Sequence, residues 1–173
     1  MKNRKKYLKL VAPLILIKGI NDVIILVSIY KGEIFMITKF RKEYFFLSNF
    51  YPCTITYKGI TYFTSEAAYQ AQKTLDESER IRISELPDPK VAKEEGQKLN
   101  IRPDWDNVKL DEMYNICKEK FTQNPELADL LMKTGDEEIV EGNDWDDTFW
   151  GVCNGEGQNN LGKILMKIRS EMM

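Results

Sequence analysis

The sequence predicts a single α+β domain that is mostly α-helical and has one small antiparallel β element. The chain has 173 residues, a length at which one core buries about two-thirds of the unfolded surface. Two Asx-Pro pairs, at positions 88–89 and 124–125, are typical of helix starts. The segment TITYKGITYF alternates as a β-hairpin does.

The first 35 residues differ in composition from the remainder. They contain seven Lys/Arg against two Asp/Glu, and two apolar runs, LVAPLILI and VIILVSIY. Each run is far shorter than the roughly 20 residues that a membrane span needs, and no small-residue cleavage site follows either run. We expect residues 1–35 to be an N-terminal extension. It can form an extra strand or helix pair, or it can be a stretch upstream of the domain, since Met36 would itself make a plausible start of the chain. Residues 36–173 are then the domain, without stable membrane association.

The remaining elements follow from local turn and capping signals. Lys58-Gly59 predicts a tight hairpin turn, and Thr64 or Ser65 can cap the next helix. Asp88-Pro89 opens a helix towards Asn100.

Further helices are predicted in the second half of the chain. The segment WDNVKLDEMYNICKEKF is loosely helical, with Asp104 as its cap. Asn124-Pro125 opens another helix, which Gly135 ends. In LGKILMKIRSEMM the apolar residues form one helical stripe, typical of core packing.

Composition excludes several classes of chemistry. The chain has no histidine, so catalysis by Ser-His or Cys-His pairs and most catalytic zinc sites are ruled out. Three cysteines without a CxxC pair indicate neither a disulfide framework nor a zinc cage, and fit a reducing cytoplasm. We therefore expect no metal and no cofactor, and acid–base work must fall to Asp, Glu, Lys, Tyr or Cys.

Charge is unevenly distributed along the chain. Residues 36–173 hold 25 − 7 = 18 basic and 27 − 2 = 25 acidic residues, a net charge of −7. Such a body disfavours broad binding to nucleic-acid backbones, although a local basic pocket stays open.

The segment TSEAAYQAQK, residues 64–73, combines four functional groups on one helical face. Residues seven apart in a helix lie about 20° from the same direction, so Glu66, Tyr69, Gln70 and Lys73 share a side. One interpretation is a solvated helix, because Glu suits a first turn and Lys is usually exposed. The other is an active site with a carboxylate, a phenol, an amide and an amine.

Three further segments combine polar and aromatic residues. EGNDWDDTFWGVCNGEGQNNLG, residues 141–162, predicts a long ordered loop of the kind that is often functional. In it Trp150 can stack on a base or pack in the core, and Asp147 can bind ribose hydroxyls; its G-x-G is a weak dinucleotide signal. EYFFLSNFYPC embeds Asn49 among aromatic rings, and RPDWD sets Trp105 at a helix start.

Together, FLSNFYPC, TSEAAYQAQK, RPDWD, VEGNDWDDTFWG and GEGQNNLGKILMKIR resemble the NADAR (YbiA-like) family, in the same order over roughly residues 40–170. The resemblance implies a largely helical domain and an N-glycosidase that cleaves a bond between ribose and a nitrogen base. Members are associated with phosphoribosylaminopyrimidine intermediates of riboflavin synthesis and with ADP-ribose on guanine. Two departures stand out, because Ala67 and Asp146 occupy positions where the family often has histidine.

The chemistry of such a cleavage assigns roles to the retained residues. The bond breaks through an oxocarbenium-like state at C1′, helped by protonation of the departing base and by a nucleophile or negative charge. We expect Glu66, Lys73 and Asp147 to be catalytic, with Glu66 as general acid or base. The family resemblance also points to Lys73, as an amine that forms a Schiff base with the sugar. Substrate-binding residues are expected to be Asn49, Tyr69, Trp105, Trp150, Gly151 and Asn159.

A second function class remains open. A non-catalytic module that binds ADP-ribose or NAD also places Trp150 and Asp147 in a pocket, but only catalysis needs an activated Lys73. The expected partner is a small nucleotide-like substrate or ADP-ribosylated guanine. The sequence leaves the choice of substrate and the oligomeric state open.

Overall fold

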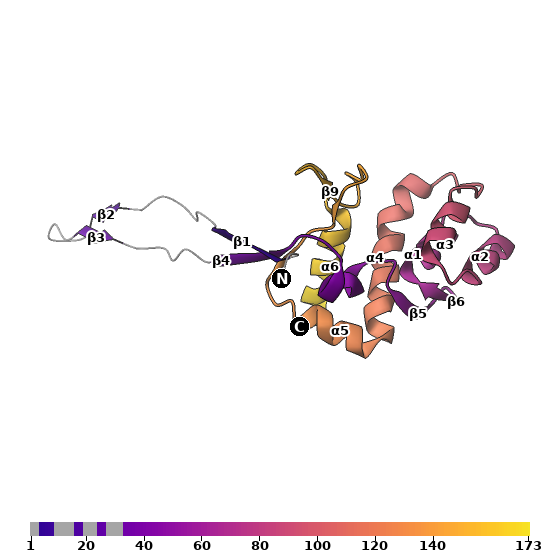
Figure 1. Cartoon of the computed structure of the whole chain (residues 1–173), viewed down its shortest axis with the longest axis horizontal. Coiled ribbons are helices and arrows are strands. Elements are labelled where there is room, and N and C mark those ends of the chain that lie inside the picture. Colours follow the sequence, from indigo (N-terminus) through magenta and orange to yellow (C-terminus); the bar gives the residue numbers. More distant parts are fainter. Residues whose placement is uncertain (1–3, 9–15, 19–23, 27–32) are drawn as a thin grey trace.

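The computed structural model of the chain describes residues 4–8, 16–18, 24–26 and 33–173, with side-chain surroundings from residue 35 onward. It confirms the predicted α+β class, with helices dominating and several very short sheets. Figure 1 shows the order of the elements: β1 (Arg4–Leu8), β2 (Leu16–Lys18), β3 (Ile24–Leu26), β4 (Glu33–Ile37), η1 (Lys42–Leu47), β5 (Pro52–Tyr57), β6 (Ile60–Thr64), α1 (Ser65–Ala71), α2 (Glu77–Ser84), α3 (Pro89–Gly96), α4 (Trp105–Gln123), α5 (Pro125–Met132), β7 (Glu138–Ile139), β8 (Gly142–Asn143), β9 (Val152–Cys153) and α6 (Asn160–Glu171).

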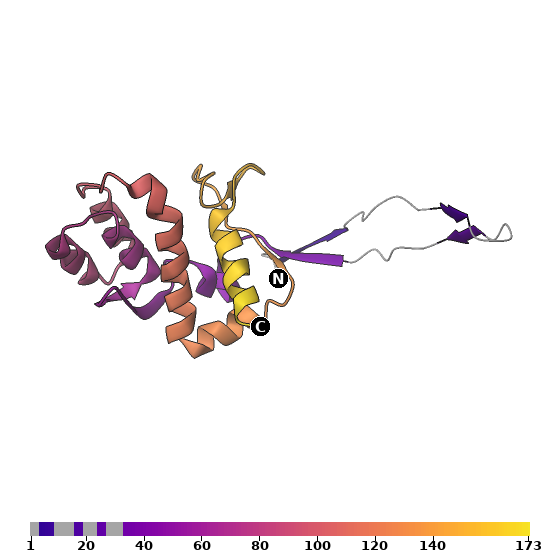
Figure 2. The same ribbon diagram turned by 180° about the vertical axis from the view of Figure 1, so that it is seen from behind.

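Helix α4 is the central element of the domain. It packs against α1, α5, α6 and β5, and Figure 2 shows α4 and α6 side by side from behind. Its buried residues join the apolar stripe of α6 and the hairpin in one core. Fully buried members include Ile37, Leu47, Ile55, Ile116, Phe121, Leu131, Ile139 and Leu165.

The predicted hairpin is confirmed as β5 and β6. Tyr57 pairs with Ile60, so Lys58 and Gly59 form a two-residue turn, with φ of 50° and 82°. A tight turn with two positive φ angles matches the right-handed twist of the strands, and glycine adopts that conformation without steric cost. The hairpin leads straight into α1, because β6 ends at Thr64.

Helix α1 is short and almost completely enclosed. The hydroxyl of Thr64 accepts a hydrogen bond of 3.1 Å from the amide of Ala67, which confirms the predicted cap. Every residue from Ser65 to Ala71 is buried. The interpretation of TSEAAYQAQK as a solvated surface helix is therefore wrong, because α2, α3 and α4 all pack around it.

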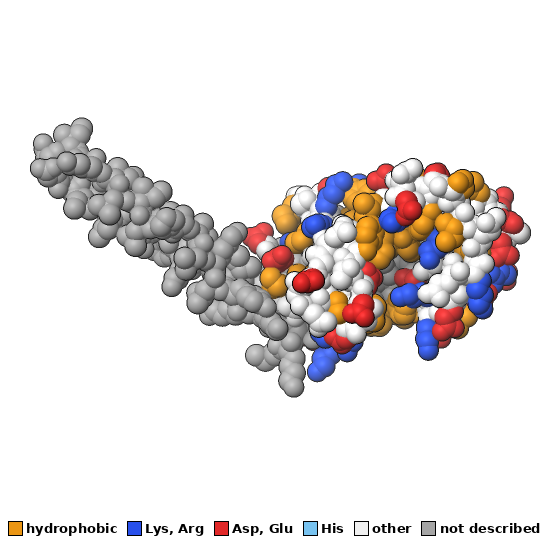
Figure 3. Space-filling view, turned by 90° about the horizontal axis from the view of Figure 1, so that it is seen from above, with side chains coloured by type: hydrophobic (Ala, Val, Ile, Leu, Met, Phe, Trp, Pro, Cys, Tyr) orange, Lys and Arg blue, Asp and Glu red, His pale blue; other side chains and the backbone are white. Residues whose placement is uncertain are grey.

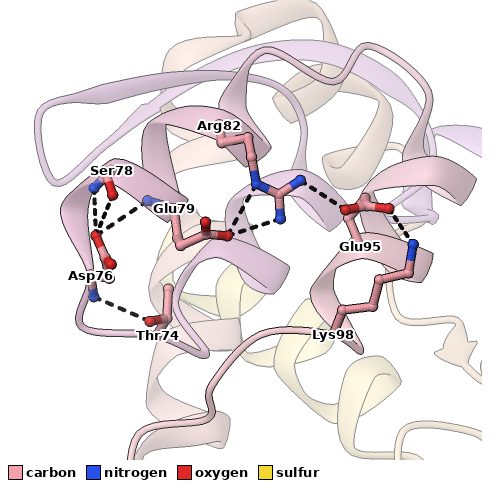
Figure 4. Close-up of polar contacts among 7 residues, drawn as sticks. All are labelled: Thr74, Asp76, Ser78, Glu79, Arg82, Glu95 and Lys98. Atoms are coloured by element: carbon pink, nitrogen blue, oxygen red, sulfur yellow. Dashed lines mark hydrogen bonds and ion pairs between the residues drawn. The ribbon is translucent and has the colours of Figure 1, made fainter.

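Helices α2 and α3 brace α1 on one side, and α2 has no counterpart in the sequence analysis. Asp76 caps α2, and Arg82 links the two helices by pairing with Glu79 at 2.9 Å and with Glu95 at 2.8 Å (Figure 4). Helix α3 starts at Pro89 as predicted, but ends at Gly96 rather than near Asn100.

Two predicted side-chain caps are wrong. Asp104 makes no capping hydrogen bond to α4 and instead pairs with Arg102, at 2.6 and 2.8 Å. Asn124 does not cap α5 through its side chain, because its amide donates to the carbonyls of Thr54 and Lys120. In both places the side chain that would cap the helix is engaged by another hydrogen-bond partner.

Short parallel pairs connect the core to the loops above it. Strand β4 pairs with β7, at Ile37 and Ile139, and β8 pairs with β9. Strand β4 also pairs antiparallel with β1. Because β4 runs from Glu33 to Ile37, it crosses the predicted boundary between residues 35 and 36. Much of the predicted extension, at 1–3, 9–15, 19–23 and 27–32, lies outside the described residues. Within the described part of the chain, no helix has the length and apolar character to cross a membrane.

Candidate active site

A cavity of about 710 Å³ opens between the loops around β8 and β9 and the helices α1, α3 and α4. Figure 3, which views the molecule from above, shows hydrophobic and basic side chains gathered on the face between those loops and α3. The lining combines residues far apart in the sequence: Phe40, Arg41, Lys42, Phe45, Ser48, Asn49, Phe50, Glu66, Tyr69, Gln70, Lys73, Lys93, Trp105, Lys109, Met113, Glu141, Gly142, Trp145, Asp147, Phe149, Trp150 and Leu161.

The face of α1 that the sequence analysis singled out points into this cavity. Glu66, Tyr69, Gln70 and Lys73 all line it, as the helical spacing requires. The carboxylate and the amine therefore share one enclosure, within two turns of the same helix.

Glu66 is 7% exposed, and both its backbone amide and its carboxylate are hydrogen-bonded. Its amide donates a hydrogen bond of 3.0 Å to the carbonyl of Asn49, and Oε1 accepts one of 2.7 Å from Nε2 of Gln70. Burial raises the pKa of the Glu66 carboxyl, because removal from water penalises its charged form, while Gln70, Lys93 and Lys73 oppose that effect. A carboxyl with a raised pKa is suited to proton transfer.

Lys73 lies at the far end of the same face. Burial lowers its pKa, the charge of Glu66 acts in the opposite direction, and Lys93 adds to the lowering. A lysine whose pKa is lowered holds more neutral amine at neutral pH, which is the nucleophilic form.

Aromatic rings form one wall of the cavity. Tyr69 contacts Trp105 with ring centroids 5.1 Å apart and Trp150 at 5.5 Å, and Trp150 contacts Phe149 at 4.9 Å. Trp150 is only partly buried and packs against the core. It thus combines both interpretations of the sequence, because one part of the indole packs and another faces the cavity.

Asp147 is fixed by its own loop. Its Oδ1 accepts hydrogen bonds from the amides of Phe149 at 3.1 Å and Trp150 at 2.8 Å. The side chain of Asn143 clamps the Asp147 backbone, receiving its amide at 3.1 Å and donating to its carbonyl at 2.8 Å. The loop 143–150 is therefore an ordered support that sets Asp147 and Trp150 at the cavity.

Asn49 lines the cavity but turns its amide towards sulfur. Its Nδ2 donates to Sδ of Met113 at 3.2 Å, and Sγ of Cys117 lies 3.7 Å from its Oδ1. The backbone of Asn49 also receives the Glu66 amide, so this residue joins the 3₁₀ segment η1 to the start of α1.

Of the nine site residues named from sequence, seven line the cavity and two do not. Asn159 is buried and bonds backbone instead, accepting from the amide of Glu141 at 3.0 Å and donating to the carbonyl of Ile139 at 2.9 Å. Gly151 is buried beneath Glu141. Both residues therefore lie behind the wall of the cavity.

Sequence reasoning missed five charged residues of the cavity, which are Arg41, Lys42, Lys93, Lys109 and Glu141. Glu141 belongs to VEGNDWDDTFWG, a segment already singled out, but nothing in its spacing distinguishes it from the other acids there. Lys93 lies on α3 and lines the same cavity as Glu66, Lys73 and Glu141, and its positive charge lowers the pKa of each of the three. Only the packing of α3 against α1 reveals it.

The model of the NADAR domain family matches residues 35–173. The chain belongs to the NADAR family. It is 41% identical over 131 residues to a riboflavin biosynthesis protein of Vibrio vulnificus, covering 73% of this chain but only 35% of that protein. It is 38% identical over 133 residues to N-glycosidase YbiA of Shigella boydii, covering 75% of this chain and 82% of the relative.

A solved structure supports the same NADAR assignment. The NMR structure of the Escherichia coli protein YbiA matches with a TM-score of 0.69 at 36% identity, over 76% of this chain and 79% of that chain. The family predicted from the sequence motifs is thereby confirmed, and the name of the YbiA relative agrees with the predicted N-glycosidase class.

The two positions at which this NADAR chain lacks the histidine of the family pattern, Ala67 and Asp146, differ in burial. Ala67 is fully buried in α1, whereas Asp146 adopts a left-handed φ of 62° in the loop above the cavity. Among the described residues there is no group of three or more Cys, Asp or Glu side chains placed to hold a metal ion.

Proposed function

We propose that this protein is an N-glycosidase that hydrolyses the bond between ribose and the base of a nucleotide-like substrate. The observation that carries the proposal is that Glu66 and Lys73 line one cavity beside an aromatic wall. Membership of the NADAR family and the names of the relatives support the reaction class.

The proposed roles follow from the pKa shifts of α1. Lys73, with a lowered pKa, attacks C1′ as a neutral amine and forms a Schiff base with the opened sugar. Glu66, with a raised pKa, moves protons beside that amine as general acid or base. Asp147 binds ribose hydroxyls through the oxygen that its loop leaves unused.

The cavity offers aromatic surfaces for the base of the substrate and basic side chains for its phosphate. Trp150, Tyr69 and Trp105 offer stacking surfaces for a base, a contact worth about 1–3 kcal/mol. Basic side chains outnumber acidic ones in the lining by five to three, against the net negative charge of the body, which favours a phosphorylated substrate. We assign Asn49 to sugar or phosphate contacts.

Two substrate groups fit this description, phosphoribosylaminopyrimidine intermediates of riboflavin synthesis and ADP-ribose attached to guanine. The decisive experiment offers purified protein both compounds side by side and measures released sugar by mass spectrometry. Release from either compound supports the proposal. Tight binding of both without release would replace it with the non-catalytic ADP-ribose-binding module.

A further inference from the structure

Glu141 is a carboxyl group of the cavity that has no role in the reaction proposed so far. It lies between β7 and β8 and lines the cavity from a segment that is far from α1 in sequence. Its position is fixed by hydrogen bonds to its backbone and by close contacts to its carboxylate.

The backbone of Glu141 is anchored on both sides. Its amide donates a hydrogen bond of 3.0 Å to Oδ1 of Asn159, and its carbonyl accepts one of 2.8 Å from the amide of Val152. Asn159 is itself tied to the carbonyl of Ile139. One buried side-chain amide thus holds both ends of the turn that carries Glu141.

The carboxylate of Glu141 is also held in place, by Asn143 and by the backbone of Gly151. Nδ2 of Asn143 donates to Oε2 at 3.4 Å, and the backbone of Gly151 lies directly against the same oxygen. A Cβ atom at position 151 would overlap both Oε2 and the carbonyl oxygen of Glu141. Glycine is therefore required there for the close approach.

Two charged residues that line the same cavity, Asp147 and Lys93, act on this carboxyl. Burial raises the pKa of Glu141 to about 7, the negative charge of Asp147 adds to the rise, and Asn143 and Lys93 oppose it. Lys39, whose stem lies near Gly142, is paired with Asp144 at 2.8 Å. Glu141 is thus partly protonated at neutral pH, as a general acid needs to be.

We propose that Glu141 is a second acid–base residue of this site, which protonates the departing base, and that Gly151 and Asn159 are positioning residues that hold it. The inference rests on the proposed N-glycosidase function. It gives the two predicted residues that lie outside the cavity a part in the reaction through Glu141.

The C1′–N bond breaks with its electron pair passing to the base nitrogen, which takes the carboxyl proton of Glu141, while the neutral amine of Lys73 bonds to C1′. The sugar ring opens as a proton passes from Nζ to the ring oxygen, which leaves a protonated Schiff base between Lys73 and C1′. One water then supplies its oxygen to C1′ and two protons to Nζ, which releases the sugar as its aldehyde and leaves Lys73 as an ammonium. Transfer of that extra proton to the Glu141 carboxylate restores both residues.

The test compares wild type with Glu141→Gln on the ribosylaminopyrimidine phosphate and on ADP-ribosylated guanine. Loss of a general acid predicts a fall in kcat of about 100-fold or more with little change in KM. The decline of wild-type kcat above pH about 7 should also vanish from the residual activity, because the titrating carboxyl is gone. Glu156→Gln, an exposed change in the neighbouring turn, should match wild type.

A second series tests the positioning residues. Asn159→Ala should move the alkaline limb of the pH profile of kcat, because it removes the acceptor for the Glu141 amide and so loosens the position of Glu141. Asn159→Asp keeps an acceptor for that amide and should partly restore the wild-type limb. Asn159→Ala with lower kcat and an unmoved limb would contradict the positioning role. Circular dichroism of each variant checks that it folds, and Glu141→Asp, which keeps a carboxyl, gives a further folded comparison.

The outcomes separate this inference from the function beneath it. A wild-type protein that releases no sugar from either compound contradicts both. An active wild type together with Glu141→Gln within about twofold of its kcat overturns the role of Glu141 alone and leaves the N-glycosidase proposal standing.

Discussion

The side-chain amide of Gln70 donates a hydrogen bond of 2.7 Å to Oε1 of Glu66, one helical turn earlier on α1. Both residues are buried and line the same cavity. The bond stabilises the charged form of Glu66 against the effect of burial, so it sets how far the pKa of this carboxyl rises.

Gln70→Leu should therefore raise the pKa of Glu66 further. If Glu66 acts as a base, the acidic limb of the kcat profile moves to higher pH, because the carboxylate forms later. The measurement is the pH dependence of sugar release, with Gln97→Leu, at an exposed position just after α3, as control. An acidic limb at the wild-type position would show that Glu66 is not the titrating group.

Lys73→Ala should reduce kcat by about 100-fold or more while substrate binding persists, because the nucleophile is removed. Borohydride should trap a sugar adduct on wild type, seen by intact mass, and no adduct on Lys73→Arg, since a guanidinium forms no Schiff base. The exposed Lys163→Ala serves as control. An adduct that survives on Lys73→Ala would assign the nucleophile elsewhere.

Trp150→Ala should weaken substrate binding by about 1–3 kcal/mol, whereas Trp150→Phe should lose much less, because a second aromatic ring keeps the stacking face. Isothermal titration with ADP-ribose measures the difference. Equal affinity for the two variants would mean that the indole packs in the core without contacting the base.

The pH dependence of stability should report on Glu141. Its folded pKa of about 7 lies above 4.5, the ordinary pKa of a glutamate carboxyl, so the stability it contributes is complete below pH 4.5 and is lost as pH rises through 7. Glu141→Gln should therefore gain on wild type by about 2 kcal/mol between pH 4 and pH 8, after discounting for partial exposure. Urea unfolding at the two pH values measures it; a constant difference would contradict the raised pKa.

Glu112 should be a strong determinant of stability away from the cavity. It is buried on α4 and accepts hydrogen bonds from Tyr57 at 2.7 Å and from Lys58 at 2.6 Å, with Arg102 at 3.4 Å. Glu112→Ala leaves these partners uncompensated and should cost about 3 kcal/mol by chemical denaturation. The exposed neighbour Asp111→Ala should cost less than about 0.5 kcal/mol.

Much of the local structure followed from short-range signals. The Lys58-Gly59 turn, the Thr64 cap and the Pro89 helix start depend on residues adjacent in sequence, and such signals act through the backbone alone. Helix α2 also has a local cap, at Asp76, but its hydrophobic periodicity is poor, and it was not predicted from the sequence. Its place depends on contacts with α1 and on the bridge that Arg82 makes to α3.

The sequence by itself determined the family, the α+β class and the pairing of Glu66 with Lys73, because ordered motifs and helical spacing are properties of the chain. Only the tertiary structure decided that this helix is buried, and that Lys93 and Glu141 join its carboxylate in one cavity. It also separated Asn159 and Gly151 from the cavity surface. The physical reason is that burial and charge proximity, which set pKa values, arise between segments whose distance in sequence says nothing about their distance in space.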